Sequence, residues 1–525
     1  MEGSITTFDI IAAAISLVTL PLLIRSVYRL YLHPLANVPG PRLAALTSLH
    51  ELWYDCFQGG GGQHAFKMRE MHDTYGPIIR INPWEVHIDG QADPAFWHVL
   101  YSQSNKLDKD GWYYSGFGGS GLSMVATVSS DLHRTRRGAV SSFFSAGHVR
   151  NCEPMVLAHV SKLIARLERC GRNGEIIDLA NAYRCLTLDV VTSFSVPEPR
   201  KMLDLADFGK GFNGLMRVFS KMITLHRHTQ VVLPLMELIP DWVGNAMDPS
   251  GAFQQLVDWR MGFVKAAQQA IDRKGIPPLG QEPSILDTIY TAPELAQKDK
   301  VMSYFVEEAT NITGAGTETT ASTLGLLTYH VLSNQEVLDK LSQELSSIAG
   351  SNLDLLGMRL LEKLPYLQAC INEALRLSNP VTGRLPRFNP RAPTTYTTPD
   401  SKTTYLLPPR TVMSMSMPDM HFNASIFPCP KIFQPSRWID SSPERLKEMN
   451  RYFVPYSKGS RSCLGMEVAK MELVLTAGNV FHQLGRGMQL WDTTERDVSW
   501  AYDFFAPYIA VDAKGLRVKI SSAEP

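Results

Sequence analysis

Apolar residues form one continuous run near the N-terminus. Between Phe8 and Ile24 the only charge is Asp9, and fifteen uncharged residues follow it. A stretch from about Ile5 to Ile24 has the roughly 20 residues needed to cross a bilayer as a helix. Basic residues follow the run from Arg25 onward, whereas a cleaved signal peptide, the alternative, carries them in front. The pattern predicts that residues 1–24 are a retained single-span anchor, with the rest of the chain in the cytoplasm.

Helical spacing of apolar residues dominates the chain beyond this run. Residues 301–332 lack proline and carry apolar side chains at helical spacing, which predicts one long helix. The sequence Ser333-Asn334-Gln335-Glu336 has the pattern of a capping box and predicts a second helix that ends near residue 348. Leu364-Pro365 predicts the start of a third, ending near residue 377, because proline suits a first helical turn.

Extended segments are short and few. They are expected at residues 78–88, at residues 394–407 and at the C-terminus. Residues 25–41 form a basic stem that ends in the stiff, proline-rich hinge Val38-Pro39-Gly40-Pro41. Without repeats or long linkers after this hinge, residues 42–525 are expected to form one large domain. The predicted fold class is mainly α with small β-sheets, preceded by one transmembrane helix.

Composition narrows the classes of function. The 525 residues are 44% hydrophobic and 19% charged, which is typical of a globular chain with a large interior and excludes a disordered one. The 51 basic residues equal the 51 acidic ones, so no broad nucleic-acid-binding surface is expected. The seven cysteines are odd in number and scattered, and no two have zinc-knuckle spacing. Reduced, mostly buried thiols are therefore the default prediction.

The middle of the long predicted helix is poor helix-forming sequence. Residues 313–320, Thr-Gly-Ala-Gly-Thr-Glu-Thr-Thr, include two glycines that cost about 1 kcal/mol each relative to alanine. Thr319 lies four residues after Ala315, so its hydroxyl can bond to that carbonyl and make room for a small ligand. Glu318 could relay protons beside it. Close packing against another helix is the alternative explanation for the small residues.

The sequence around Cys463 carries the strongest chemical signal. Residues 453–465, Phe-Val-Pro-Tyr-Ser-Lys-Gly-Ser-Arg-Ser-Cys-Leu-Gly, place glycines on both sides of the cysteine, and a helical pattern follows. A cysteine before a helix and near Arg461 has its thiolate favoured by the helix dipole and by backbone N–H groups. Such a thiolate can be a nucleophile or an iron ligand, and no protease or phosphatase signature surrounds it.

Four motifs together resemble the cytochrome P450 superfamily. Tyr456, Gly459, Arg461, Cys463 and Gly465 match its haem-binding loop, where phenylalanine usually occupies the first position. The other three motifs follow the order of the family: residues 315–320 resemble its oxygen-binding helix, Glu373 to Arg376 its Glu-x-x-Arg pair, and residues 433–438 the segment that completes this pair. The resemblance covers nearly the whole chain and implies a P450 fold with haem b.

The resemblance also implies a role for each matching residue. Cys463 would be the axial thiolate ligand of the haem iron, a ligand that favours O–O cleavage. Thr319 and Glu318 would deliver protons to bound O₂. The partners of the two haem propionates would be Arg461, Arg387 and Arg137. The other haem contacts would be Gly459, Tyr456, Ala315 and His133, the last in place of the usual tryptophan. A structural triad would be formed by Glu373, Arg376 and Arg437.

Three further segments are similar to the fungal branch related to trichodiene oxygenase, namely residues 28–35, 75–83 and 131–137. This similarity implies a monooxygenase that takes electrons from an NADPH reductase and hydroxylates or epoxidises an apolar terpenoid, polyketide or alkaloid intermediate of secondary metabolism. It further implies an endoplasmic reticulum location with the catalytic domain in the cytosol. A haem-thiolate isomerase or dehydratase that consumes no O₂ is the first alternative, and a non-catalytic haem sensor is the second.

Substrate contacts are expected on the long helix and on two loops. Counting back from Thr319 at helical spacing brings Ala315, Asn311, Ile312 and Glu308 toward one face. The resemblance adds Val381 and Thr382 and a loop at about residues 112–124. Exposed Arg134, Arg136 and Lys458 are expected to form either a basic docking face for an acidic reductase or an ordinary solvated surface.

Overall fold

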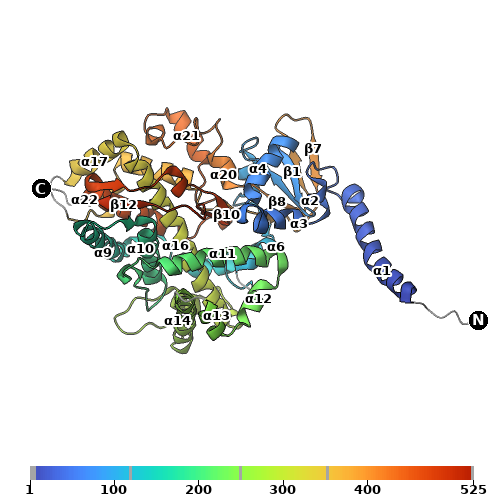
Figure 1. Ribbon diagram of the computed structural model, residues 1–525, viewed down its shortest axis with the longest axis horizontal. Helices are drawn as coiled ribbons and strands as arrows, with labels where there is room; N and C mark the ends of the chain where they lie inside the picture. The colour runs from blue at the N-terminus through green and yellow to red at the C-terminus, as the bar shows by residue number, and fades with distance from the viewer. Residues whose placement is uncertain (1–6, 118–120, 248–250, 350–353, 522–525) are drawn as a thin grey trace, which may run out of the picture.

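The N-terminal helix projects away from the body of the protein. In this computed structural model, residues 7–117, 121–247, 251–349 and 354–521 are described, so Ile5 of the predicted span lies outside them. Helix α1 (Thr7–Val27) extends beside the sheet-rich part of the molecule (Figure 1). Within the described residues, Ile15–Leu32 has a mean hydropathy of 1.4 and no buried residues. The predicted apolar N-terminal helix is thus confirmed, and it continues past Ile24 into the basic stem.

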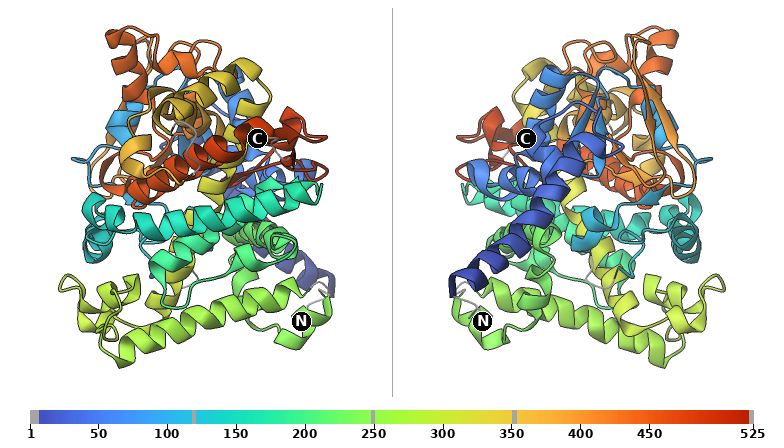
Figure 2. Two further views of the ribbon diagram at one scale, coloured as in Figure 1. Left: turned by 90° about the vertical axis from the view of Figure 1, so that its left-hand side faces the viewer. Right: turned by 90° about the vertical axis from the view of Figure 1, so that its right-hand side faces the viewer.

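Helices form most of the domain that follows. They gather on the side opposite α1 in Figure 1, and α14, α13 and α12 form an outer layer in both views of Figure 2. Their bounds are α2 Arg42–Leu46, α3 Leu49–Leu52, α4 His64–Tyr75, α5 Phe96–Leu100, α6 Gly111–Tyr114, α7 Ser130–Ser141, α8 Ala146–Asn151, α9 Glu153–Arg172, α10 Leu179–Ser195, α11 Lys210–Thr229, α12 Val232–Glu237, α13 Asp241–Met247, α14 Ala252–Asp272, α15 Ile285–Thr291, α16 Met302–Leu332, α17 Gln335–Ala349, α18 Met358–Leu361, α19 Pro365–Ser378, α20 Met417–His421, α21 Pro443–Tyr452 and α22 Met466–Leu484.

The strands form small sheets, as predicted. The largest has five strands in the order β1-β2-β8-β5-β3, in which β2 and β8 are parallel and the other neighbours are antiparallel. Every residue of β1 and β2 is buried, which suits the β-branched residues of these strands. The bounds are β1 Ile78–Asn82, β2 Glu85–Ile88, β3 Asp108–Lys109, β4 Ile177–Asp178, β5 Arg387–Phe388, β6 Thr394–Thr397, β7 Thr404–Leu407, β8 Val412–Ser414, β9 Met488–Leu490, β10 Tyr502–Phe504, β11 Ala506–Tyr508 and β12 Arg517–Ile520.

Helix α16 is the long helix that the sequence predicts, and it runs through the main hydrophobic core. Apolar side chains of α9, α10, α16, α19 and α22 form that core. A side chain at Gly316 would collide with Val191 of α10, so the two backbones approach closely there. Packing against α10 and the surrounding core therefore stabilises a helix whose central sequence is intrinsically weak.

The predicted capping box of the next helix is wrong by one residue. Helix α17 begins at Gln335, and the Asn334 side chain accepts hydrogen bonds from the N–H groups of Glu336 (3.1 Å) and Val337 (3.3 Å). Ser333 instead donates its hydroxyl to the carbonyl of His330. Asparagine and serine cap helices about equally well, so packing of the preceding helix decides which residue acts.

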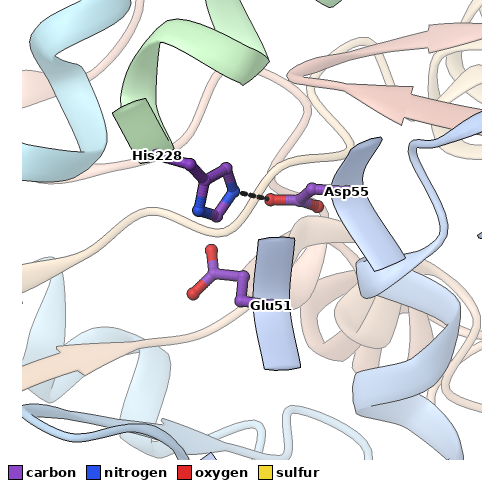
Figure 3. Close-up of side chains that lie close together, drawn as sticks. All are labelled: Glu51, Asp55 and His228. Carbon is purple, nitrogen blue, oxygen red and sulfur yellow. Dashed lines mark hydrogen bonds and ion pairs between the residues drawn. The ribbon is translucent and has the colours of Figure 1, made fainter. Parts of the chain in front are cut away.

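A buried ion-pair network joins the N-terminal segment to the end of α11 (Figure 3). Glu51 and Asp55 face His228, whose Nε2 lies 2.9 Å from Asp55 Oδ2. Carboxylates and a histidine in this arrangement could hold a metal ion. Here, however, Asp55 pairs with Arg227 at 3.2 Å and Glu51 with Arg384 at 2.7 Å. Although burial opposes ionisation, Arg384 holds the pKa of Glu51 at about 2. The arginines thus neutralise the carboxylates, and the network has a structural role: it links the N-terminal segment to α11.

Candidate functional site

Cys463 lies in the loop that precedes α22. Its N–H donates to the carbonyl of Tyr456 at 2.8 Å, which folds the loop around the thiol. Gly459 has φ +79°, and a side chain there would collide with the carbonyl of Tyr101, so glycine is required. Burial raises the pKa of the Cys463 thiol, while the Gly465 N–H and Arg137 act in the opposite direction. Cys463 is nonetheless an exposed residue, so a ligand can reach its thiol.

Cationic side chains gather close to this loop. Arg137, Arg387 and Arg461 are joined there by Lys109, and none of the four forms a salt bridge with any residue that the structure describes. Burial, together with Arg387, lowers the pKa of Arg461 to about 10. Burial lowers the pKa of His133 to about 2, and the positive charge of Arg461 contributes to this shift, so the imidazole is neutral. Lys109 and Arg387 are buried and Arg137 and Arg461 half-buried, and cations without an ion-pair partner are costly in such places, so the cluster is suited to an anionic ligand.

Backbone carbonyls and one tyrosine hydroxyl hold these cations in place. Arg137 donates to the carbonyl of Ser462 at 2.7 Å, directly beside the cysteine. Arg461 donates to the carbonyl of Thr127 at 2.8 Å. Arg387 donates to the Tyr114 hydroxyl at 3.1 Å and Lys109 to the carbonyl of Val125 at 2.6 Å. Neutral acceptors orient the four groups without cancelling their charge.

In the glycine-rich part of α16, both explanations of the small residues apply: close packing against another helix and room for a small ligand. Gly316 packs against α10, whereas no atom lies within 4 Å of a side chain built at Gly314, and Ala315 is exposed. Thr319 Oγ1 donates to the carbonyl of Ala315 at 2.8 Å, the bond expected from their spacing. One side of the helix is therefore closely packed, and the other opens onto free space beside the Thr319 hydroxyl.

Glu318 faces a different direction from Thr319. Its carboxylate accepts two hydrogen bonds of 2.8 Å from Arg184 of α10. The pair borders a cleft of about 610 Å³, which Tyr508 also lines and Cys463 does not. A carboxylate held by a bidentate arginine beside a cleft can exchange protons with water there only when it leaves that pair.

The residues of the predicted structural triad lie together. Glu373 and Arg376 of α19 form two hydrogen bonds of 2.7 and 3.0 Å, and Arg437 reaches Glu373 at 2.9 Å. The Trp438 ring nitrogen also donates to Glu373, at 2.9 Å. All three charged side chains are at most 5% exposed. Arg376 further donates to the carbonyl of His421, so the triad fixes the segment that precedes the cysteine loop.

Comparison with known families decides the identity. The cytochrome P450 family matches residues 45–484, which is most of the chain. The chain is a cytochrome P450. A crystal structure of the cytochrome P450 CYP102L1 superposes with a TM-score of 0.65 at 18% identity, covering 88% of this chain and 98% of that one. The predicted fold class is confirmed.

Three relatives of this P450 are fungal proteins. Cytochrome P450 monooxygenase MO6277 of Ascocoryne sarcoides is 34% identical over 502 residues, covering 94% of this chain and 95% of the relative. Fusicoccadiene C-8 hydroxylase of Phomopsis amygdali is 33% identical, covering 95% and 94%. Tryptophan 6-hydroxylase fscE of Fusarium equiseti is also 33% identical, covering 94% of each. The predicted oxidoreductase class and the resemblance to fungal P450 monooxygenases are confirmed.

The residues of this P450 fit the haem-thiolate cofactor that its family implies. Cys463 would supply the thiolate, and the four cations near it, which form no salt bridge with the described residues, suit the two propionates. The Tyr456 hydroxyl is buried without a hydrogen-bond partner among the described residues, and burial raises its pKa. Ala315 leaves open space on α16. His133 is buried and neutral, so it can donate one ring N–H.

The predicted substrate residues divide into two groups. Ile312 and Val381 are half-buried apolar side chains, as a pocket wall requires. Asn311 instead donates its amide to the carbonyls of Phe117 (2.8 Å) and Glu307 (2.9 Å). Thr382 is fully buried and donates its hydroxyl to Asp503 at 2.7 Å, where burial raises the pKa of Asp503 to about 6. In the predicted substrate loop, residues 118–120 lie outside the described residues.

The predicted basic face is wrong in one of its three members. Arg136 is 6% exposed, and its guanidinium donates to the carbonyl of Gly121 and lies over the Tyr304 ring. Arg134 is exposed but pairs with Asp131 at 2.9 Å. Lys458 donates to a backbone carbonyl. Helix α7 begins at Ser130, which directs His133 and Arg137 to one face and Arg136 into the core.

Sequence reasoning missed Lys109, Arg184 and Glu307. Lys109 stands in a two-residue strand, and Arg184 in a helix whose residues are mostly buried. A charged residue among buried apolar neighbours is the signal that could have drawn attention to Arg184. Its partner Glu318 lies 134 residues away, so the pairing itself has no local signature.

Proposed function

We propose that this P450 is a membrane-anchored monooxygenase that receives electrons from an NADPH reductase and hydroxylates or epoxidises an apolar intermediate of fungal secondary metabolism. The observation that carries the proposal is the cluster of unpaired cations around Cys463, in a chain whose relatives are monooxygenases. The proposed cofactor is haem b, whose iron activates O₂ when bound.

The chain's own residues have three tasks in this reaction. Cys463 Sγ would hold the haem iron, and Arg137, Arg387 and Arg461 would bind the propionates. The Thr319 hydroxyl, oriented by the Ala315 carbonyl, holds a proton beside the open part of α16. These groups need no rearrangement before the reaction, because neighbouring backbone carbonyls already fix them.

Proton supply is assigned to Glu318. Its carboxylate lies between α10 and the cleft that Tyr508 lines, on the residue next to Thr319. We propose that it takes up a proton when it leaves Arg184 and passes it toward Thr319 Oγ1. Return to Arg184 restores the ionised carboxylate, so the ion pair resets the relay.

An apolar substrate agrees with the side chains available. Ile312, Val381, Leu122 and Met124 are half-buried and apolar, and Phe117 packs edge-on against Phe505 at 4.6 Å. Two of the named relatives are hydroxylases of fusicoccadiene and of tryptophan, so the family alone does not specify the substrate. Metabolite profiling after deletion of the gene is the experiment that names it, through the precursor that accumulates.

Membrane attachment is supported by two surfaces. The exposed apolar helix α1 is the first. The second is the α12–α13 region, where Leu235, Leu238 and Trp242 are 56%, 76% and 73% exposed. Both extend toward the lower edge in Figure 1. Basic residues after α1 favour a cytosolic catalytic domain on the endoplasmic reticulum.

Removal of residues 1–27 is expected to shift the protein from the membrane pellet toward the soluble fraction without loss of haem. Fractionation after expression, with the haem absorbance as a control, measures both effects. Complete retention in a salt-washed pellet would mean that the α12–α13 region is sufficient as an anchor. Release of the full-length chain by a salt wash would contradict the single-span anchor.

Thr319→Ala is expected to uncouple reductant use from product formation. Without the hydroxyl, protons reach the open part of α16 less selectively, so product per NADPH should fall several-fold while NADPH consumption continues. The measurement compares product, NADPH and O₂ in a reductase-coupled assay, with Thr319→Ser as the conservative control. Full coupling in Thr319→Ala would contradict the assigned role. Turnover without O₂ consumption by the wild type would favour an isomerase or dehydratase.

A further inference from the structure

Two adjacent glutamates of α16 hold a neighbouring loop through its backbone. Glu307 Oε2 accepts hydrogen bonds from the N–H groups of Leu122 (3.2 Å) and Ser123 (3.3 Å). Glu308 Oε2 accepts one from the N–H of Met124 at 2.7 Å. Two carboxylates thus accept hydrogen bonds from three successive N–H groups, and these bonds fix the direction of residues 122–124. We call Glu307 and Glu308 the loop clip.

Two further side chains hold the same region. Asn311, one turn after Glu307, donates to the carbonyl of Phe117 at 2.8 Å. From α7, Arg136 donates to the carbonyl of Gly121 at 3.2 Å and to the hydroxyl of Thr127. The described residues on each side of positions 118–120 are therefore attached to helices α16 and α7.

The position of Glu308 is energetically demanding. The residue is only 2% exposed, and burial raises its pKa to about 7. The Met124 N–H, Arg136 and Lys109 favour its ionised form, whereas Glu307 opposes it. The Tyr304 hydroxyl, also buried nearby, has no hydrogen-bond partner among the described residues. Above about pH 7, where it is ionised, the Glu308 carboxylate forms a stronger bond with the Met124 N–H than a neutral side chain would.

The clipped segment carries apolar side chains to the site. Leu122 and Met124 are half-buried and pack against the same core cluster as Ile312 of α16. Phe117 contacts Phe505, whose carbonyl accepts the N–H of Thr382. Glu308, which holds the loop, is on the same face of α16 as Ile312, Ala315 and Thr319, so the loop lies beside the face that opens at Ala315.

We propose that Glu307 and Glu308 position residues 122–124 as a fixed wall of the substrate pocket and thereby limit the size of the substrates that this P450 accepts. This inference rests on the proposed function, because it takes the open part of α16 as the place of reaction. The two glutamates are positioning residues: they act through the loop backbone and need not touch the substrate.

Amide hydrogen exchange tests the clip itself. In the full-length haem protein, the N–H groups of residues 122–124 should be protected in the wild type. The double variant Glu307→Gln/Glu308→Gln should exchange them about tenfold faster or more, since amide side chains accept more weakly and do not carry charge. The matched control is Thr310→Ala on the same turn, whose hydroxyl bonds only within α16, to the carbonyl of Val306. Exchange of these amides in the wild type at the rate of an unstructured peptide would overturn the inference.

Azole binding tests the effect on the pocket. Imidazole and the bulky 1-tritylimidazole both shift the haem absorbance, so their dissociation constants can be measured without turnover. The double variant should bind 1-tritylimidazole at least fivefold more weakly, because the wall no longer packs against it, and imidazole within twofold of the wild type. Equal effects on both azoles, or none on either, would overturn the size-limiting role.

Two outcomes separate this inference from the proposed function. A wild type without haem absorbance would defeat the proposed function, while exchange of residues 122–124 would still report on the clip. If the double variant fails to incorporate haem, the single variant Glu307→Gln at a half-buried position is compared by exchange at Leu122 and Ser123. Unchanged exchange there would contradict the clip.

Discussion

Cys463→Ala is expected to abolish the thiolate spectrum of this P450 and its monooxygenase activity. The cysteine supplies the only side chain in its loop able to bind iron as a soft anion, and its N–H already fixes it against Tyr456. Product formation should fall by at least a thousandfold, because proximal ligation is lost altogether. Absorption spectra of the purified protein with CO under reducing conditions, together with the reductase-coupled assay, measure both effects.

Cys152→Ala is the matched control for this prediction. Cys152 is a half-buried thiol at the start of α9, well separated from the haem loop in sequence, and its Sγ donates to the carbonyl of His148. Its replacement should leave spectrum and activity unchanged. An unaltered spectrum in Cys463→Ala, or its loss in Cys152→Ala, would refute the ligand assignment.

Glu373→Gln is expected to prevent stable haem incorporation. The substitution leaves Arg376 and Arg437 buried beside a neutral amide, and removal of one partner from a buried ion pair costs about 3–5 kcal/mol. Loss of this order is comparable with the total stability of many domains. The measurements are thermal unfolding and the haem content of the purified protein.

The surface pair Glu336–Lys340 provides the control for the triad. These residues lie one turn apart on α17 at 2.7 Å, and both side chains are more than half exposed. Exposed pairs of this kind contribute about 0–1 kcal/mol, so Glu336→Gln should leave haem content unchanged. Equal stability of the Glu373→Gln and Glu336→Gln variants would contradict the structural role of the triad.

Local sequence patterns predicted the elements of this fold well. The proline-free run at 301–332, the Leu364-Pro365 start and the extended segments each depend on a few neighbouring residues, and the structure contains all of them. Where two residues compete locally, as Ser333 and Asn334 do for the cap of α17, the pattern cannot choose, because packing of α16 decides the register.

Long-range pairings could not be predicted in the same way. Motif spacing indicated Cys463, Thr319 and the triad, but the partner of Glu318 is Arg184, which is far away in the sequence. Arg136 stands next to Arg137 and three residues after His133, both predicted at the haem site, yet the helical phase of α7 directs it into the core. Such contacts depend on how whole helices pack, which no short motif records.

The absorption spectrum of the reduced wild-type protein under CO tests the central claim most directly. If Cys463 holds haem through its thiolate beside the cationic cluster, the CO complex should show the red-shifted Soret band of thiolate ligation, with about one haem per chain. A purified, folded chain that binds no haem, or a CO complex with the Soret position of histidine-ligated haem, would contradict the claim.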